Sequence, residues 1–474
     1  MPALIPYAFA RAHSLLPAGE RAGRLQLWVT EATPPVAVME VRRALARDVE
    51  PIIVSRERFE EGLRAAYAQA EGEAATVVGE VQSEIDLARL MQDLPQVEDL
   101  LEARDDAPIV RMLNALLTQA VQERASDIHI EPFESCSVVR FRVDGTLRDV
   151  VRPHRALHAA LVSRIKIMAD LDIAEKRLPQ DGRILLRLGG RQVDVRVSTL
   201  PAGHGERAVL RLLDKEQGRL EPERLGMSPA VLSTLERIVR QPHGIVLVTG
   251  PTGSGKTTTL YAMLSKLDAA TTNIMTVEDP IEYDLAGIAQ TQVNPRIGMN
   301  FARALRAILR QDPDVIMIGE IRDLETAQIA VQASLTGHLV LATLHTNDSV
   351  AAVTRLLDMG VEPFLLSSSL LAILAQRLVR RLCPSCRRQD ARGQWHPLGC
   401  PSCQGSGYRG RAGVYELLVV DDAIREAIHS GEGEQALRRL AQQRGFRSLR
   451  EDGERWVASG ETSLEELLRV AREQ

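Results

Sequence analysis

The sequence predicts an α/β protein of several domains, the largest of which is built on a parallel sheet. The chain has 474 residues, and at about 100–200 residues per domain this length suggests about three domains. From residue 231 onward, short apolar runs alternate with helical stretches, which is the pattern of βαβ units around a sheet buried on both faces. Residues 107–230 instead combine hairpin signals with two helical stretches, the pattern of an α+β domain.

The first eighty residues are expected to form a domain of their own. They contain strand patterns at 24–30 and 50–55 and helical patterns at 36–47 and 58–71. Because no catalytic pattern is found among them, we interpret residues 1–80 as a partner-docking domain.

An acidic segment then leads into the middle domain. Residues 80–106 carry nine acidic and two basic side chains, which predicts a partly helical linker over 81–106. The middle domain should contain helices at 108–123 and 155–169 and hairpin turns at 144–145 and 189–190. Its expected strands are 127–131, 137–143, 146–150, 183–188, 191–198 and 207–213.

The last domain, residues 231–474, contains the apolar runs of the predicted parallel sheet. Its expected strands are 244–249, 274–278, 315–319 and 339–344. The tail, 421–474, is expected to be helical.

Composition indicates whether the protein binds nucleic acid and in which compartment it is found. The net charge is −5 and aromatic residues make up 3%, whereas nucleic-acid binding relies on basic and aromatic side chains. We therefore expect no nucleic-acid partner. The start of the chain lacks the pattern of a secretory signal, and the longest uncharged stretch, 326–347, is interpreted as helix, turn and buried strand. We expect a cytoplasmic protein.

A phosphate-binding loop is the most specific motif. Residues 250–257 fit GxxxxGK[ST], follow an apolar strand and precede a helix. Backbone N–H groups of such a loop hold phosphates, the lysine reaches the β- and γ-phosphates, and the Thr257 hydroxyl holds Mg²⁺. The predicted nucleotide-binding residues are Gly250, Pro251, Thr252, Gly253, Ser254, Gly255, Lys256, Thr257 and Thr258.

Acidic side chains are expected beside this loop. Residues 276–282 place three carboxylates at the end of a strand, and Glu278 is a candidate to polarise the attacking water. Residues 312–320 resemble a Walker B strand, but Gly319 stands where many P-loop enzymes have an aspartate, and Glu320 follows. Glu320 is a candidate to assist the metal, and the sequence leaves the two roles undivided.

Histidines and arginines complete the set of candidates. His338 and His345 flank the strand at 339–344 and are expected near the γ-phosphate. Arginines that stabilise transition-state charge in phosphoryl transfer often come from a distant part of the chain. The candidates are Arg196, Arg207 and Arg211 in the middle domain and Arg306, Arg310 and Arg322 in the last domain. Surface ion pairing is the alternative for each of them.

Four cysteines predict a structural metal. Cys383, Cys386, Cys400 and Cys403 form two Cys-Pro-Ser-Cys pairs separated by thirteen residues, and the loop between them has few apolar residues. A tetrahedral Zn²⁺ with four thiolates and no open position would organise this loop over 383–403. His396 is a less favoured ligand, and the remaining Cys136 is expected to be inert.

Together these motifs resemble the secretion ATPase superfamily, which includes the type II secretion ATPases and the type IV pilus motors. The resemblance rests on the P-loop, an "Asp box" at 276–282, the Walker B segment 309–323 and a "His box" at 336–346, with ASDIHIE at 125–131 and RVSTLP at 196–201. It covers nearly the whole chain. It implies a RecA-like ATPase domain, a PAS-like α+β middle domain and a hexamer that binds ATP with Mg²⁺.

The resemblance also implies residue roles and partners. Arg196 and Arg211 would act as arginine fingers, and Arg411 in Gly-Arg-Ala-Gly would approach the nucleotide base. The four cysteines and the start LIPYAFA at 4–10 favour the type II secretion branch (general secretory pathway protein E) over pilus-extension motors. Residues 1–80 would then dock on the cytoplasmic part of the inner-membrane L component. The polytopic F component and, indirectly, acidic phospholipid would be further partners of a protein peripheral at the inner membrane.

Three hypotheses remain open from the sequence. The first is an ATP hydrolase that drives pseudopilus assembly and protein export across the outer membrane, with type IV pilus assembly as its alternative. The second is a nucleic-acid-stimulated ATPase of the helicase type, which the charge and the few aromatic residues oppose. The third is an assembly scaffold that binds nucleotide with little turnover, for which the departure at Gly319 leaves room.

Overall fold

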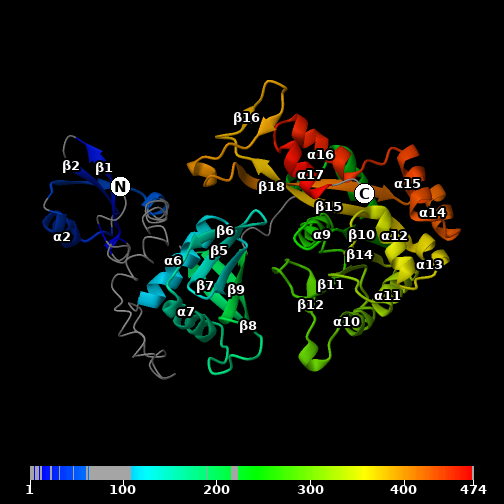
Figure 1. Cartoon of the computed structure of the whole chain (residues 1–474), viewed down its shortest axis with the longest axis horizontal. Helices are drawn as coiled ribbons and strands as arrows, with labels where there is room; N and C mark the ends of the chain where they lie inside the picture. The colour runs from blue at the N-terminus through cyan, green and yellow to red at the C-terminus, as the bar shows by residue number, and fades with distance from the viewer. Residues whose placement is uncertain are drawn as a thin grey trace. The chain divides into compact units, whose positions relative to one another are not determined.

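The computed structural model divides the chain into two compact units, Met1–Lys215 and Glu216–Gln474 (Figure 1). The residues it describes are 5, 10, 13–21, 24–30, 32–45, 47–59, 62, 108–188, 191–214 and 222–471. The linker expected over 81–106, the turn at 189–190 and most of the helix expected over 58–71 lie outside these residues.

The N-terminal domain contains a small three-stranded sheet. Its described elements are β1 (Leu15–Arg21), β2 (Arg24–Val29), α2 (Pro35–Leu45) and β3 (Val49–Ile53). Strand β2 pairs antiparallel with β1 and parallel with β3. The strands expected at 24–30 and 50–55 and the helix at 36–47 are confirmed, but β1 was not predicted. Pro17 and Gly19 break the alternating pattern of β1, and its register shifts between them.

The middle domain is an antiparallel sheet with helices on one face. Its elements are α6 (Pro108–Gln122), β4 (Asp127–Pro132), β5 (Ser137–Val143), β6 (Thr146–Val151), α7 (Arg155–Met168), β7 (Gln180–Leu188), β8 (Arg191–Ala202) and β9 (Gly205–Asp214). The strand order is β6-β5-β4-β9-β8-β7. Ile128 and Phe141 pack with Leu113 and Leu161 of the helices in one core. Every predicted helix and strand of this domain is confirmed, as is the turn after β5, where Asp144 has φ 49°.

The second unit is built on a seven-stranded sheet. In spatial order its strands are β12 (Ala289–Gln292), β11 (Ile274–Glu278), β13 (Val315–Ile318), β14 (Leu339–Leu344), β10 (Gly244–Thr249), β15 (Leu370–Leu382) and β18 (Tyr408–Val419). All neighbouring pairs are parallel except β15 and β18. The four predicted strands are confirmed, whereas β12, β15 and β18 were not predicted.

Helices cover both faces of this sheet. The alternating side chains of β10 show this, since successive residues are buried in hydrophobic cores on opposite faces. Ile245 and Leu247 pack on one face, and Val246 and Val248 on the other. The helices before the tail are α8 (Pro229–Ile238), α9 (Lys256–Leu264), α10 (Phe301–Ile308), α11 (Leu324–Leu335), α12 (Ser349–Asp358) and α13 (Pro363–Ser369). The predicted helical tail is confirmed as α14 (Asp422–His429), α15 (Glu434–Gln443), α16 (Leu449–Ala458) and α17 (Leu464–Val470).

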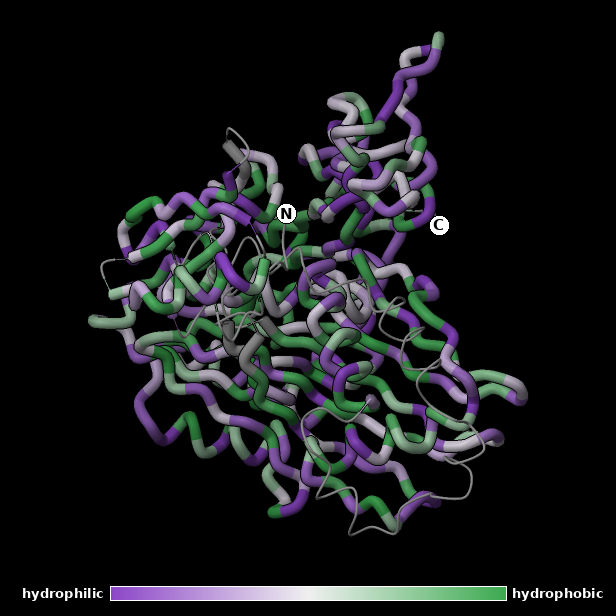
Figure 2. Tube along the Cα trace, turned by 90° about the vertical axis from the view of Figure 1, so that its left-hand side faces the viewer, coloured by the Kyte–Doolittle hydropathy of each residue, from purple (hydrophilic) through white to green (hydrophobic). Residues whose placement is uncertain are grey.

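Figure 2 shows how hydropathy follows this arrangement. Hydrophobic residues gather on the inner strands, and hydrophilic residues dominate the outer loops. Among the described helices, none combines the length and the apolar character needed to cross a bilayer.

Candidate phosphate-binding and metal sites

The loop between β10 and α9 has the conformation of a phosphate-binding loop. Gly250, Gly253 and Gly255 all have φ between 78° and 149°. Gly255 caps the amino end of α9 without a side-chain hydrogen bond, so the first N–H groups of that helix remain available to an anion. The predicted loop is therefore found where the sequence placed it, at the carboxyl end of a central strand.

Gln376 of β15 packs directly under this loop. A Cβ atom on Gly250 would lie 2.5 Å from the Gln376 carbonyl oxygen, and one on Gly255 would lie 2.8 Å from Gln376 Nε2. Gln376 Oε1 also accepts a hydrogen bond from Thr259 Oγ1 at 2.7 Å. Glycines at 250 and 255 are thus required by close approach as well as by conformation. The sequence analysis did not single out Gln376, because β15 itself was not predicted.

Lys256 is a buried cation at the centre of the site. Its Nζ donates to the carbonyl oxygens of Gly250 at 2.7 Å and Pro251 at 3.1 Å, and the residue is 8% exposed. Burial lowers the pKa of Lys256 to about 8, while the charge of Glu320 opposes this shift. Ser254 lies beside it with a buried Oγ that has no hydrogen-bond partner among the described residues. A lysine without a carboxylate partner and an unsatisfied hydroxyl fit a phosphate ligand.

The remaining predicted nucleotide-binding residues occupy the same turn. Pro251, Thr252 and Gly253 are exposed on the loop, and Thr257 and Thr258 are half-buried in the first turn of α9.

Glu278 is enclosed in a hydrogen-bond network at the end of β11. Its Oε1 accepts from Thr276 Oγ1 at 2.6 Å and from Gln290 Nε2 at 3.0 Å, and its Oε2 accepts from the Tyr261 hydroxyl. The residue is 2% exposed. Because both carboxylate oxygens already accept hydrogen bonds, Glu278 ties the P-loop helix α9 to β11 and β12.

Glu320 has different surroundings, just past β13. Its Oε1 accepts a hydrogen bond from Arg322 Nη2 at 2.5 Å, and its Oε2 lies 3.3 Å from His345 Nε2. Its negative charge opposes the lowering of the Lys256 pKa that burial causes. A Cβ atom at Gly319 would come within 3.2 Å of the Val277 carbonyl oxygen and 3.3 Å of Glu278 Cα. The close approach of β11 thus disfavours a side chain at residue 319, where many P-loop enzymes have aspartate.

The two histidines lie at opposite ends of β14. Strand β14 runs parallel to β10, with Leu344 beside Thr249 and Leu339 beside Gly244. His345 therefore lies at the P-loop end, whereas His338 lies at the far end, where its Nδ1 donates to the Ala333 carbonyl oxygen at 2.9 Å and closes α11. The expectation that both histidines lie near the γ-phosphate is wrong for His338, because a strand of six residues separates it from the loop.

The arginines of the second unit differ in what they contact. Arg306 pairs with Glu325 at 2.5 Å, and Arg310 donates to the Arg306 carbonyl oxygen at 2.8 Å. Arg411 is exposed on β18, opposite Arg380 and at the same end of the sheet as the P-loop. Arg377, which the sequence analysis did not single out, donates to the Asn347 carbonyl oxygen at 2.7 Å beside the loop.

The arginines of the middle domain share one face of its sheet, opposite the helices. Arg211 lies across from Asp127 on one side and from Arg196 on the other. Arg211 Nε donates to Asp127 Oδ1 at 3.0 Å. Arg207 instead places Nη2 2.6 Å from Glu131 Oε1.

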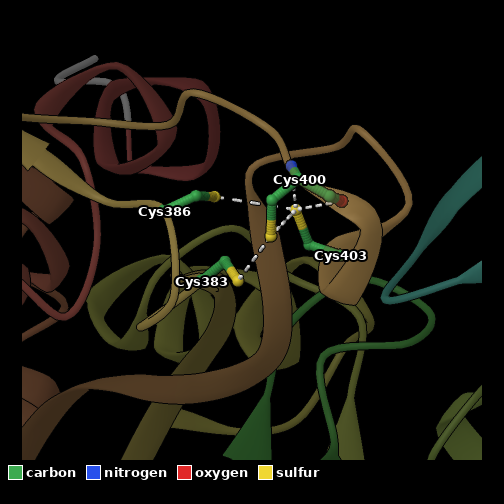
Figure 3. A group of neighbouring side chains, drawn as sticks. All are labelled: Cys383, Cys386, Cys400 and Cys403. Atoms are coloured by element: carbon green, nitrogen blue, oxygen red, sulfur yellow. Dashed lines mark hydrogen bonds between the residues drawn. The ribbon is translucent and has the colours of Figure 1, made fainter.

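The four predicted cysteine ligands converge (Figure 3). The Sγ atoms of Cys383 and Cys400 are 3.8 Å apart, and the Sγ atom of Cys403 lies 3.7 Å from those of both Cys386 and Cys400. A tetrahedral Zn²⁺ with Zn–S bonds of about 2.3 Å requires sulfur separations of about 3.8 Å. His396 pairs with Asp390 instead, at 3.1 Å. The donor set therefore fits a closed zinc site.

Backbone groups around Cys403 favour its thiolate, whereas burial raises the pKa of Cys386 to about 12. Burial would raise the pKa of the Cys403 thiol, but N–H groups of Cys400 and Gly407, each 3.2 Å from its Sγ, lower it to about 6. Arg387 anchors the loop to the tail by donating to the Gly460 carbonyl oxygen at 2.6 Å and stacking on Trp395. Cys136 is a free cysteine just before β5, as expected of a residue outside the cluster.

Comparison with known families agrees with these features. Residues 102–469 match a family model described as Type II/IV secretion system protein, and residues 4–67 match one described as a domain of GSPII protein E. The chain is 66% identical over 472 residues to Type II secretion system protein HxcR of Pseudomonas aeruginosa, covering 99% of each chain. It is 53% identical over 487 residues to Type II secretion system ATPase E of Vibrio cholerae, covering 99% of this chain and 97% of the relative.

Solved structures share the fold. The Legionella pneumophila ATPase DotB is similar with a TM-score of 0.59 at 22% identity, over 76% of this chain and 94% of that chain. The pilus retraction motor PilT with bound ADP is similar with a TM-score of 0.53 at 27% identity, over 76% and 97%. The predicted α/β class with an ATPase core is thereby confirmed. The chain belongs to the Type II/IV secretion system protein family and is an ATPase coupled to type II secretion.

Proposed function

We propose that the chain binds Mg²⁺ and ATP at residues 250–257 and that a hexamer of it uses hydrolysis to assemble the pseudopilus that exports proteins across the outer membrane. The observation that carries the nucleotide site is Lys256, a buried lysine whose partners among the described residues are both carbonyl oxygens, at a helix start without a side-chain cap. Similarity to a motor solved with ADP supports the same site.

Within the site, Lys256 would hold the β- and γ-phosphates, and Thr257 would hold the metal, whose charge would neutralise the phosphates. We propose Glu320, rather than Glu278, as the carboxylate that acts at the γ-phosphate or its water. The charge of Glu320 acts on Lys256, and the Glu320 side chain is 15% exposed. Glu278 is 2% exposed and enclosed in its own hydrogen-bond network.

Arginines would complete the site. Arg196 and Arg211 are proposed as arginine fingers and Arg411 as the residue that approaches the base. The exposed side chain of Arg211, at 57%, and the position of Arg411 at the P-loop end of the sheet support these roles. The four cysteines are proposed to hold one structural Zn²⁺.

The N-terminal domain is proposed to dock on the cytoplasmic part of the inner-membrane L component. Val36 and Met39 of α2 and Ile53 of β3 are each more than 70% exposed, so this domain offers large apolar side chains to a partner. Contacts with the F component and, through partners, with acidic phospholipid would keep the protein at the cytoplasmic face of the inner membrane.

ATP hydrolysis by the purified full chain tests this proposal. We expect slow turnover alone and faster turnover with the partner's cytoplasmic domain and vesicles containing acidic lipid. Lys256→Ala sets the background, because it removes the phosphate-binding cation. Turnover no higher than this background in both conditions would contradict the proposal.

A further inference from the structure

The proposed finger Arg211 is held by a carboxylate on the neighbouring strand. Asp127 and Arg211 are directly opposite each other on β4 and β9, and Arg211 Nε donates to Asp127 Oδ1 at 3.0 Å. Asp127 is 5% exposed, whereas the side chain of Arg211 is 57% exposed. A fixed, buried acceptor therefore holds the inner nitrogen of an exposed guanidinium.

The outer nitrogens of Arg211 remain available. Its Nη1 and Nη2 have no hydrogen-bond partner within the part of the chain that the structure describes. Guanidinium groups bind phosphate best through such paired nitrogens in a fixed fork. A carboxylate at Nε restricts the rotation of the group and leaves this fork facing outward.

Asp127 is itself fixed from several sides. Ser126 Oγ donates to Asp127 Oδ2 at 2.7 Å, and Arg142 Nε lies 3.7 Å from the same oxygen. Arg142 and Arg211 are the two cross-strand neighbours of Asp127, and Arg196 is the next residue in the row. Since like charges opposite each other destabilise a sheet, the buried carboxylate between Arg142 and Arg211 offsets repulsion within this row.

Glu131 provides a contrast on the same strand and face. It pairs with Arg207 through the terminal Nη2 at 2.6 Å, and Arg207 Nη2 also lies 3.2 Å from His129 Nδ1. One terminal nitrogen of Arg207 is thus occupied, so Arg207, unlike Arg211, does not keep both terminal nitrogens available.

We propose that Asp127 is a positioning residue that orients Arg211 for the phosphates of ATP. The inference rests on the proposed function of Arg211 as an arginine finger and adds that Asp127 fixes the orientation of its guanidinium. Asp127 makes no contact with the nucleotide in this proposal, so its effect must pass through Arg211.

A double-mutant cycle on the full chain, assayed with the partner domain and acidic-lipid vesicles, tests the proposal. We expect Asp127→Ala to lower kcat at least about tenfold, since small misplacements of a positioned group have effects of this size, and to change KM for ATP little. In the Arg211→Ala background, adding Asp127→Ala should change kcat less than about twofold. Asp127→Asn, which keeps an acceptor for Nε, should retain more activity than Asp127→Ala.

The control is Glu131→Gln, which alters the carboxylate that holds Arg207 and should leave kcat near the wild-type value. Thermal unfolding of each variant identifies those that fail to fold, and Asp127→Asn then replaces Asp127→Ala in the cycle. An equal loss from the Asp127 substitution with and without Arg211 would overturn the inference, as would wild-type kcat in Asp127→Ala. Wild-type kcat in Arg211→Ala would instead reject the finger itself.

Discussion

Lys256 is a cation that makes no ion pair among the described residues and is held by two carbonyl oxygens. Burial lowers its pKa to about 8, from an ordinary value of 10.5. The residue therefore keeps a full charge below about pH 7 and loses it as the pH rises through 8. Phosphates would restore the charged form by pairing with it.

Binding of ATP should consequently take up a proton at alkaline pH. At pH 9 we expect uptake approaching one proton per site, because the free lysine is mostly neutral, and at pH 7 only about a tenth of a proton. Calorimetry in buffers of different ionisation enthalpy measures this number. Lys256→Arg, whose guanidinium stays charged, should bind ATP without uptake, and equal uptake by both proteins would contradict the assignment.

The two acidic candidates should separate by their effects on turnover and on stability. Glu320→Gln should retain ATP binding and lower turnover by about 10²–10⁴-fold, the range for loss of an acid–base group. Glu278→Gln should retain most turnover but lower the free energy of unfolding by about 1–3 kcal/mol, since it disturbs a buried network with Tyr261. The rate of ATP hydrolysis and the free energy of unfolding in denaturant, measured for both variants, distinguish a catalytic role from a structural one. An active Glu320→Gln beside an inactive, stable Glu278→Gln would reverse the roles.

At the scale of elements, the zinc loop should fold around one ion. Its two short strands, β16 (Arg388–Gln389) and β17 (Trp395–His396), contribute little buried apolar surface. Elemental analysis should find about one zinc per chain, and Cys400→Ser should lose it and become protease-sensitive between 384 and 407. Cys136→Ser is the matched control, because it removes a cysteine outside the cluster and should keep the zinc. Zinc retained in Cys400→Ser would contradict the four-cysteine site.

Strands were predicted from the pattern of apolar residues along short segments, and β15 was missed because its pattern changes along its length. The strands of the central sheet were found because β10, β13 and β14 are largely apolar and are buried at every position. Strand β15 begins in the same way but continues through Gln376 and Arg377 to an exposed Arg381 and a buried Leu382, so no single period describes it. The P-loop contact with Gln376 was unpredictable for that reason.

Site residues that lie in one sequence motif could be placed from the sequence, whereas those brought together by strand order and register could not. The P-loop and the four cysteines are contiguous motifs, and their geometry follows from spacing alone. His338 and His345 both stand next to β14, but only the parallel register with β10 shows which end faces the loop. Likewise, the pairing of Asp127 with Arg211 joins residues 84 positions apart and depends on strand order.

At the scale of the whole molecule, the residues proposed to act in hydrolysis are distributed over the two compact units of the chain. The P-loop, Glu320 and His345 belong to the second unit, and Arg196 and Arg211 belong to the first. If Arg196 and Arg211 act as fingers in a hexamer, as proposed, hydrolysis should depend on assembly.

The rate of ATP hydrolysis by monomer and by enforced hexamer tests this central claim most directly. Each state is compared with Lys256→Ala in the same state, so that only turnover at the P-loop counts. The account predicts a low rate for the monomer, a rate at least about tenfold higher for the hexamer, and loss of that gain in Arg211→Ala. Equal rates near the Lys256→Ala background in both states would contradict it and favour a nucleotide-binding scaffold.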